Sequence, residues 1–141
     1  MTERADALAQ LCRQFQIAIL YVFGSRAGEV KAWLEGSRSG LAAGPGDVDV
    51  GVKLAQGAAL SVRDKVRLAQ ALEDMMGVNR VDLVCMEEAD PFLAANVVRG
   101  ERLYADSRYR ADEYDLYVLR RAGDLAPLER ERMALILGRS S

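Results

Sequence analysis

Three carboxylates on two predicted strands are the residues of this chain best suited to do chemistry. Asp47 and Asp49 belong to the segment Gly46-Asp-Val-Asp-Val-Gly51, and Asp82 lies within Arg80-Val-Asp-Leu-Val84. Residues two apart on a strand point to the same face, so Asp47 and Asp49 would stand side by side and repel each other. A divalent cation is the usual partner that compensates such a pair. The pattern therefore predicts a metal site formed by Asp47, Asp49 and Asp82.

The turn that follows the first predicted strand suits a phosphate group. An apolar run ends at Gly24-Ser25, where Gly24 lets the backbone turn sharply and come close to a ligand. The backbone N–H groups at the start of a following helix favour anions, and the Ser25 hydroxyl is a further donor. Arg26 can add charge-assisted contacts to a phosphate, or it can pair with Glu29 or Asp47 instead. A phosphate-binding turn beside metal-binding carboxylates predicts nucleotide chemistry.

Transfer of a nucleotidyl group from a nucleoside triphosphate such as ATP makes three demands on a site. The triphosphate must be held, the attacking and leaving oxygens must be aligned, and the developing charge must be neutralised. Two divalent ions held by carboxylates can perform the last two tasks. Asp82 is placed to contact one ion and to accept the proton of the attacking hydroxyl. The simpler interpretation of Asp82 is a surface salt bridge with Arg80, two residues away on the same face.

The composition restricts both the class of protein and the metal. With 141 residues, 50% of them hydrophobic, the chain is expected to form one domain over 1–141. The net charge of −2 argues against broad affinity for nucleic acid. Histidine is absent, which excludes a His-dependent triad or His-ligated zinc in this chain and favours an oxygen-liganded ion, Mg²⁺ or Mn²⁺.

The location expected from the sequence is cytoplasmic. No apolar run approaches the roughly 18 residues that span a membrane. The N-terminus is polar and does not resemble a signal peptide. The cysteines Cys12 and Cys85 lie far apart in the sequence, and both are interpreted as small buried hydrophobic residues.

Hydrophobic periodicity predicts alternating helices and strands. Helices are expected at 3–15, 27–34, 61–76 and 91–99, and strands at 17–23, 47–54, 80–86 and 102–104. The glycine-rich segment 36–46 is expected to be a loop. The C-terminal segment 107–141 is predicted to be helical, with a break around 123–127. This order predicts an α/β (α+β) domain with a small mixed central sheet flanked by helices.

Three of these segments resemble the motifs of a known family. The sequences Phe23-Gly-Ser-Arg26, Gly46-Asp-Val-Asp-Val50 and Arg80-Val-Asp-Leu-Val84 are similar to those of the minimal nucleotidyltransferases. That family belongs to the superfamily of DNA polymerase β and the aminoglycoside nucleotidyltransferases. The resemblance extends over 17–104. It implies a polymerase β-like fold and an Mg²⁺-dependent enzyme whose nucleotide and metal ligands are Gly24, Ser25, Asp47, Asp49 and Asp82.

The resemblance also implies a partner. Many small members of the family are the antitoxin half of a two-gene system with an all-helical HEPN-domain toxin, and some add AMP from ATP to a tyrosine of that toxin. One departure from the family's pattern is the longer spacer between Ser25 and Asp47, which contains Trp33 and Arg38. An insertion at 27–46 that loops out leaves the catalytic geometry intact. One that folds over the site can close on ATP, hold a partner or block the site.

Two other functions remain open at this point. The chain can be a binding module that keeps the fold and neutralises or scaffolds a partner without chemistry. It can also be a small-molecule transferase, such as an antibiotic-modifying enzyme, although no obvious second domain is present to shape an acceptor pocket. The tyrosines of the C-terminal third and the apolar segment 128–137 either pack on their own domain or contact a partner or a second copy.

Overall fold

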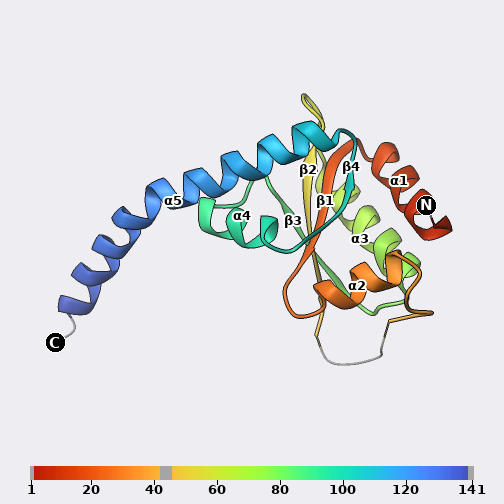
Figure 1. Ribbon diagram of the computed structural model, residues 1–141, viewed down its shortest axis with the longest axis horizontal. Helices are drawn as coiled ribbons and strands as arrows, with labels where there is room; N and C mark the ends of the chain where they lie inside the picture. Colours follow the sequence, from red (N-terminus) through yellow and green to blue (C-terminus); the bar gives the residue numbers. More distant parts are fainter. Residues whose placement is uncertain (1, 42–45, 140–141) are drawn as a thin grey trace.

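The computed structural model describes residues 2–41 and 46–139, in which helices and strands alternate (Figure 1). The helices are α1 (Glu3–Gln14), α2 (Ala27–Leu34), α3 (Val62–Met76), α4 (Pro91–Val98) and α5 (Arg108–Arg139). The strands are β1 (Ile17–Phe23), β2 (Val48–Leu54), β3 (Val81–Cys85) and β4 (Glu101–Ala105). These bounds confirm the predicted order of elements. The residues 42–45 of the predicted loop lie outside the described part.

The strands form one mixed sheet in the order β3-β2-β1-β4. Strand β1 is antiparallel to both β2 and β4, whereas β2 and β3 run parallel. Helices α1, α2 and α3 cover one face of the sheet, and α4 and the first half of α5 cover the other (Figure 1). The prediction of a small mixed sheet flanked by helices is therefore confirmed.

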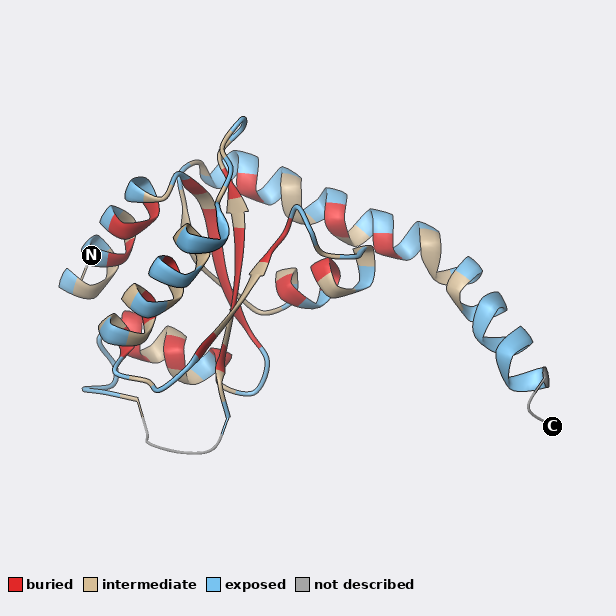
Figure 2. Ribbon diagram, turned by 180° about the vertical axis from the view of Figure 1, so that it is seen from behind, coloured by how far each residue is buried: buried red, intermediate tan, exposed pale blue. Residues whose placement is uncertain are grey.

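Alternation along the strands divides the core into two layers. The valines of β2, Val48, Val50 and Val52, pack with α1, α2 and α3. Gly51 lies on the opposite face, so close to Val97 of α4 that an added Cβ would overlap with that side chain. Strand β1 is buried on both faces, which explains its continuous apolar sequence (Figure 2). Because Asp49 alternates with the three valines, it shares the face of Gly51.

Side-chain caps define where the central helices begin. The Ser61 hydroxyl accepts a hydrogen bond from the Asp64 backbone N–H, and the Asp90 carboxylate accepts two at the start of α4. Helix α3 ends at Gly77, whose φ of +69° is a left-handed conformation that favours glycine. These caps agree with the predicted starts of both helices and with the predicted end of α3.

The predicted break in the C-terminal helix is wrong. Helix α5 continues through Gly123 and Pro127 to Arg139 and curves away from the domain (Figure 1). A proline inside a helix removes one backbone hydrogen bond and bends the axis, but it does not have to end the helix when strong helix formers surround it. Leu128 and Leu135 in this second half are 61% and 62% exposed, so it does not dock on its own domain (Figure 2).

The first half of α5 is attached to the sheet by a partly buried polar network. The hydroxyl of Tyr21, a fully buried residue of β1, donates a hydrogen bond to the Asp115 carboxylate of α5. Arg102 of β4 lies 3.5 Å from the same carboxylate and 2.6 Å from that of Asp112. Burial, followed by the hydrogen bond to Asp115, raises the pKa of Tyr21 far above its ordinary value, so its hydroxyl remains a donor. None of the described helices is both long and apolar enough to cross a membrane.

Removing the Tyr21 hydroxyl tests this attachment. Tyr21→Phe should lower the free energy of unfolding by about 1.5–3 kcal/mol, because a buried hydrogen bond to a charged group is lost. Urea denaturation measures the change. The matched control is Tyr109→Phe, at a tyrosine that is 71% exposed, for which we expect a change below about 0.5 kcal/mol. Equal effects of the two substitutions would contradict the role of the network.

Candidate active site

The three predicted carboxylates lie at the same end of two neighbouring strands. In the register of the sheet, Phe23 of β1 pairs with Asp49 of β2, and Asp49 pairs with Asp82 of β3. Asp47 immediately precedes β2. Because β2 and β3 are parallel and start side by side, their first residues meet at one edge of the sheet. The fold therefore places the three carboxylates that the sequence predicts to act together at the same end of two neighbouring strands.

Gly24 follows Phe23 and lies against the Asp49 carboxylate. A Cβ added to Gly24 would be 2.6 Å from Oδ2 of Asp49, closer than side chains pack. The φ of Gly24 is +80°, which also favours glycine over any residue with a side chain. The backbone conformation thus favours glycine at position 24, and the missing side chain leaves room for the Asp49 carboxylate. The turn and the acidic residues form one site.

The site is crowded with negative charge. Partial burial, then the nearby carboxylates of Asp82 and Asp47, raises the pKa of Asp49 above its ordinary value. A raised pKa means that the folded state binds a proton at Asp49 more readily than the unfolded chain does. Ionised Asp49 therefore costs stability at neutral pH, and a cation between the carboxylates would relieve that cost.

Arg80 supplies positive charge to two of the carboxylates. Its Nε lies 3.1 Å from Oδ1 of Asp82 and 3.6 Å from Oδ2 of Asp47. The pairing with Asp82 was the simpler interpretation from the sequence, and the structure shows it. The contact with Asp47 was not predicted, because it depends on the register between β2 and β3. The guanidinium is 68% exposed, so each contact contributes only about 0–1 kcal/mol.

Ser25 and Arg26 connect this edge to α2. Ser25 is exposed in the turn after Gly24. Arg26 pairs with Glu29 at 2.7 Å and donates a hydrogen bond of 3.3 Å to the carbonyl of Gly46, which precedes Asp47. The alternative pairing of Arg26 with Glu29 is thus present. In this arrangement Arg26 also links the turn after β1 to the entry of β2.

The donor set fits a hard cation that is bound together with a nucleotide. Among the residues at 2–41 and 46–139, no group of three acidic, cysteine or histidine side chains is close enough together to hold a metal ion. Mg²⁺ is typically held by one or two carboxylates, waters and the phosphates of its substrate, and not by a cage of protein ligands alone. Asp47 and Asp49 can supply the protein's share, with Asp82 beside them.

One close packing contact behind the site was not predicted. Gly100, between α4 and β4, touches the end of β1 so closely that an added Cβ would overlap with the Val22 carbonyl oxygen. This contact supports the end of the strand from which Gly24 turns. A glycine after a helix indicates a cap in the sequence, but the contact with β1 follows only from the tertiary fold.

Comparison with known proteins identifies the family. The model of the polymerase beta nucleotidyltransferase family matches residues 7–109. The chain belongs to this family, and both the acidic residues and the turn after β1 lie inside the matched region. None of the curated protein sequences matches the chain significantly.

Solved structures with the same fold include several toxin–antitoxin complexes. A mutant of the MntA–HpeT toxin–antitoxin pair is 20% identical, covers 97% of this chain and 98% of its own, and has a TM-score of 0.67. A tri-AMPylated HEPN toxin of Shewanella oneidensis in complex with MNT antitoxin gives 20% identity, 98% and 97% coverage and a TM-score of 0.63. A toxin–antitoxin structure with AMP-PNP is 21% identical, covers 97% of this chain and 98% of its own, and has a TM-score of 0.63. At this level of identity the similarity shows the fold.

The charge crowding predicts the effect of neutralising Asp49. In the absence of metal at pH 7, Asp49→Asn should raise Tm by about 1–2 °C, because the substitution removes a destabilising ionised group. The difference should shrink as the pH falls and disappear below the unfolded pKa of about 3.9, because the carboxyl is then protonated in the folded and the unfolded state alike. Thermal unfolding in EDTA across this pH range measures it. A lower Tm for the variant at pH 7 would show that the carboxylates do not repel.

Arg80 should compete weakly with a divalent cation. In Arg80→Met the carboxylates of Asp47 and Asp82 lose their partner, so Mn²⁺ should bind more tightly. Because exposed ion pairs contribute about 1 kcal/mol at most, the gain should not exceed about fivefold. Titration of the nucleotide-free protein with Mn²⁺, followed by electron paramagnetic resonance, measures the affinity. Arg63→Met, at an exposed arginine on α3, is the control. Weaker Mn²⁺ binding by Arg80→Met would rule out competition.

Proposed function

We propose that this chain is an Mg²⁺-dependent nucleotidyltransferase that transfers AMP from ATP to a hydroxyl of a cognate HEPN-domain toxin, and so acts as an antitoxin. The observation that carries the proposal is the row of residues across three strands. Gly24, at the end of β1, lies against Asp49, and Asp49 pairs in register with Asp82. This arrangement supports the proposal, because a turn that suits a phosphate group lies beside carboxylates of the kind that bind Mg²⁺.

The proposed reaction assigns a role to each part of this edge. The turn at Gly24 and Ser25 binds the triphosphate through backbone N–H groups and the Ser25 hydroxyl. Asp47 and Asp49 would hold the metal, which would supply positive charge to neutralise the triphosphate. The hydroxyl oxygen of the acceptor forms a bond to the α-phosphorus, and the bond from that phosphorus to the bridging oxygen breaks, so that pyrophosphate leaves. Asp82 takes the hydroxyl proton.

Arg26 has a positioning role in this proposal. Its guanidinium is already engaged by Glu29 and the Gly46 carbonyl. We infer that Arg26 helps to position Asp47, because it links the turn after β1 to the residue that precedes Asp47. Gly24 and Ser25 are therefore the main phosphate-binding residues in this proposal.

The choice of acceptor rests on the solved structures with the same fold. They include a complex with a tri-AMPylated HEPN toxin and a toxin–antitoxin structure with AMP-PNP. Both match nearly the full length of this chain, α5 included. A hydroxyl on a helical partner protein is accordingly the proposed acceptor, and ATP the proposed donor.

Transfer to the partner can be measured directly. The wild type, the cognate HEPN-domain protein, Mg²⁺ and ATP labelled at the α-phosphate should yield a covalently labelled partner. Asp49→Asn should reduce the rate about 100-fold or more, because the loss of a metal ligand costs several kcal/mol of transition-state stabilisation. The matched control is Asp74→Asn, at an exposed acid on α3, which should transfer at the rate of the wild type. Transfer by Asp49→Asn at the wild-type rate would rule out the mechanism.

A binding module is the second candidate, and the contacts of Arg80 favour it. In the described structure Arg80 occupies two of the three carboxylates. A stable complex between the two proteins with no label on the partner, in both Mg²⁺ and Mn²⁺, would support binding alone. Label on an added aminoglycoside and none on the partner would support a small-molecule transferase.

A further inference from the structure

Helix α5 carries a stripe of exposed residues along one side. The stripe consists of Tyr117, Arg121, Asp124, Leu128, Glu131 and Leu135. Their spacing alternates between four and three residues, which places all six on one side of a helix. This seven-residue repeat is typical of helices that pack along one another.

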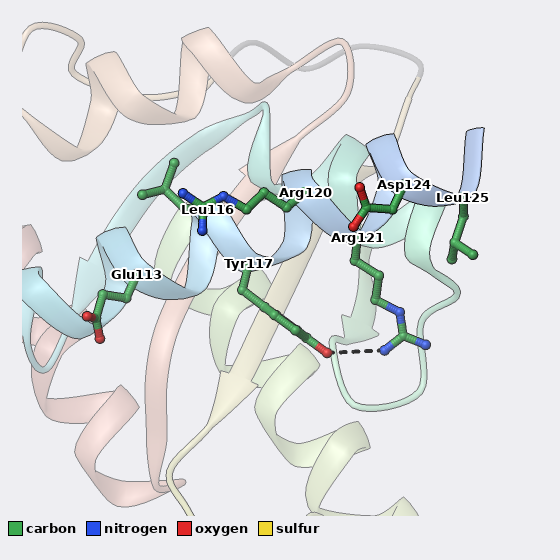
Figure 3. A pocket seen from close by; sticks show the side chains of 7 residues that line it. All are labelled: Glu113, Leu116, Tyr117, Arg120, Arg121, Asp124 and Leu125. Atoms are coloured by element: carbon green, nitrogen blue, oxygen red, sulfur yellow. Dashed lines mark hydrogen bonds between the residues drawn. The ribbon is translucent and has the colours of Figure 1, made fainter. Parts of the chain in front are cut away.

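The stripe exposes both apolar surface and unpaired charge. Tyr117, Leu128 and Leu135 are 55%, 61% and 62% exposed. Arg121 donates a hydrogen bond to the Tyr117 hydroxyl (Figure 3). No carboxylate within 2–41 and 46–139 forms a salt bridge with Arg121. Glu131 likewise has no salt bridge to an arginine or lysine of the described chain. The first half of the stripe borders a hollow of about 820 Å³ on α5 (Figure 3).

The stripe is complementary to itself in an antiparallel arrangement. When two copies of α5 are paired antiparallel about residue 126, Tyr117 of one copy faces Leu135 of the other. In the same register Arg121 faces Glu131, and Asp124 faces Leu128. The apolar pair and the charged pair each occur twice, once on either side of the axis. A single register thus covers exposed apolar side chains and gives Arg121 and Glu131 a partner, while Asp124 stays without one.

We propose that a second copy of this chain packs on the stripe, and that the two α5 helices form an antiparallel pair. The second half of each helix extends beyond its own domain and would lie along the domain-bound half of the other (Figure 1). The contact from residue 117 to residue 135 would extend for about 27 Å of helix. The carboxylates of the candidate active site lie on the sheet and not on α5, so this contact leaves them accessible.

Asp124 and Leu128 form the one mismatched pair in this register, because a charged residue faces an apolar one. Replacing Asp124 with leucine would put two apolar residues opposite each other on both sides of the axis. Asp124→Leu should therefore strengthen the association by about tenfold, since a leucine that is buried at an interface contributes more than 1 kcal/mol.

The experiment is sedimentation of the full chain over a range of micromolar concentrations. The wild type should change reversibly from monomer to dimer. Arg121→Glu should weaken the dimer about tenfold, because it places two acids opposite each other. The double variant Arg121→Glu/Glu131→Arg should recover affinity to within about threefold, because the pair is restored with its signs exchanged. Residues 121 and 131 lie too far apart on one helix to compensate each other within a chain.

Other outcomes would overturn the proposal. A wild type that stays monomeric at every concentration shows that a second copy does not cover the stripe. A dimer that Arg121→Glu leaves intact, or that the double variant does not restore, excludes this register. The control Arg63→Glu makes the same change of charge on α3 and should leave the dimer unchanged, and circular dichroism verifies that α5 is intact. Asp49→Asn should also leave the dimer unchanged, which separates this proposal from the proposed function.

Discussion

The candidate site depends on one close approach, that of the Gly24 backbone to the Asp49 carboxylate. Pairing of β1 with β2 and of β2 with β3 puts Phe23, Asp49 and Asp82 in one row, and the turn after Phe23 must then pass beside Asp49. A side chain at Gly24 would overlap with that carboxylate. The buried valines of β2, the packing of Gly51 on α4 and the Gly100 contact all serve to hold the strands in this register.

The same arrangement lowers the stability of the folded chain at neutral pH. Three carboxylates share one edge of the sheet, and their repulsion together with partial burial raises the pKa of Asp49. Arg80 offsets part of that charge through exposed contacts that a divalent cation can displace. The charge that Arg80 leaves uncompensated is the charge that the proposed cation would neutralise.

Much of the fold and of the candidate site could be predicted from the sequence, because local sequence patterns determine the strands and the helix starts. The alternation of Val48, Val50 and Val52 set one face of β2 inward, and the caps at Ser61 and Asp90 fixed the starts of two helices. The contact of Arg80 with Asp47 could not be predicted, because it depends on how β2 and β3 align. The continuity of α5 through Pro127 was mispredicted, because a proline bends a helix with strong helix formers around it as readily as it ends one.

The central claim, that the turn after β1 and the three carboxylates form one nucleotide and metal site, can be tested by paramagnetic broadening. Mn²⁺ with a non-hydrolysable ATP analogue would be added to ¹⁵N-labelled protein, and backbone amide signals would be followed by NMR. The amide signals of Gly24, Ser25, Asp49 and Asp82 should broaden first, while those around Lys53 at the opposite end of β2 should remain sharp. Broadening that begins around Lys53 or on α5, with Gly24 and Asp49 unaffected, would contradict this claim.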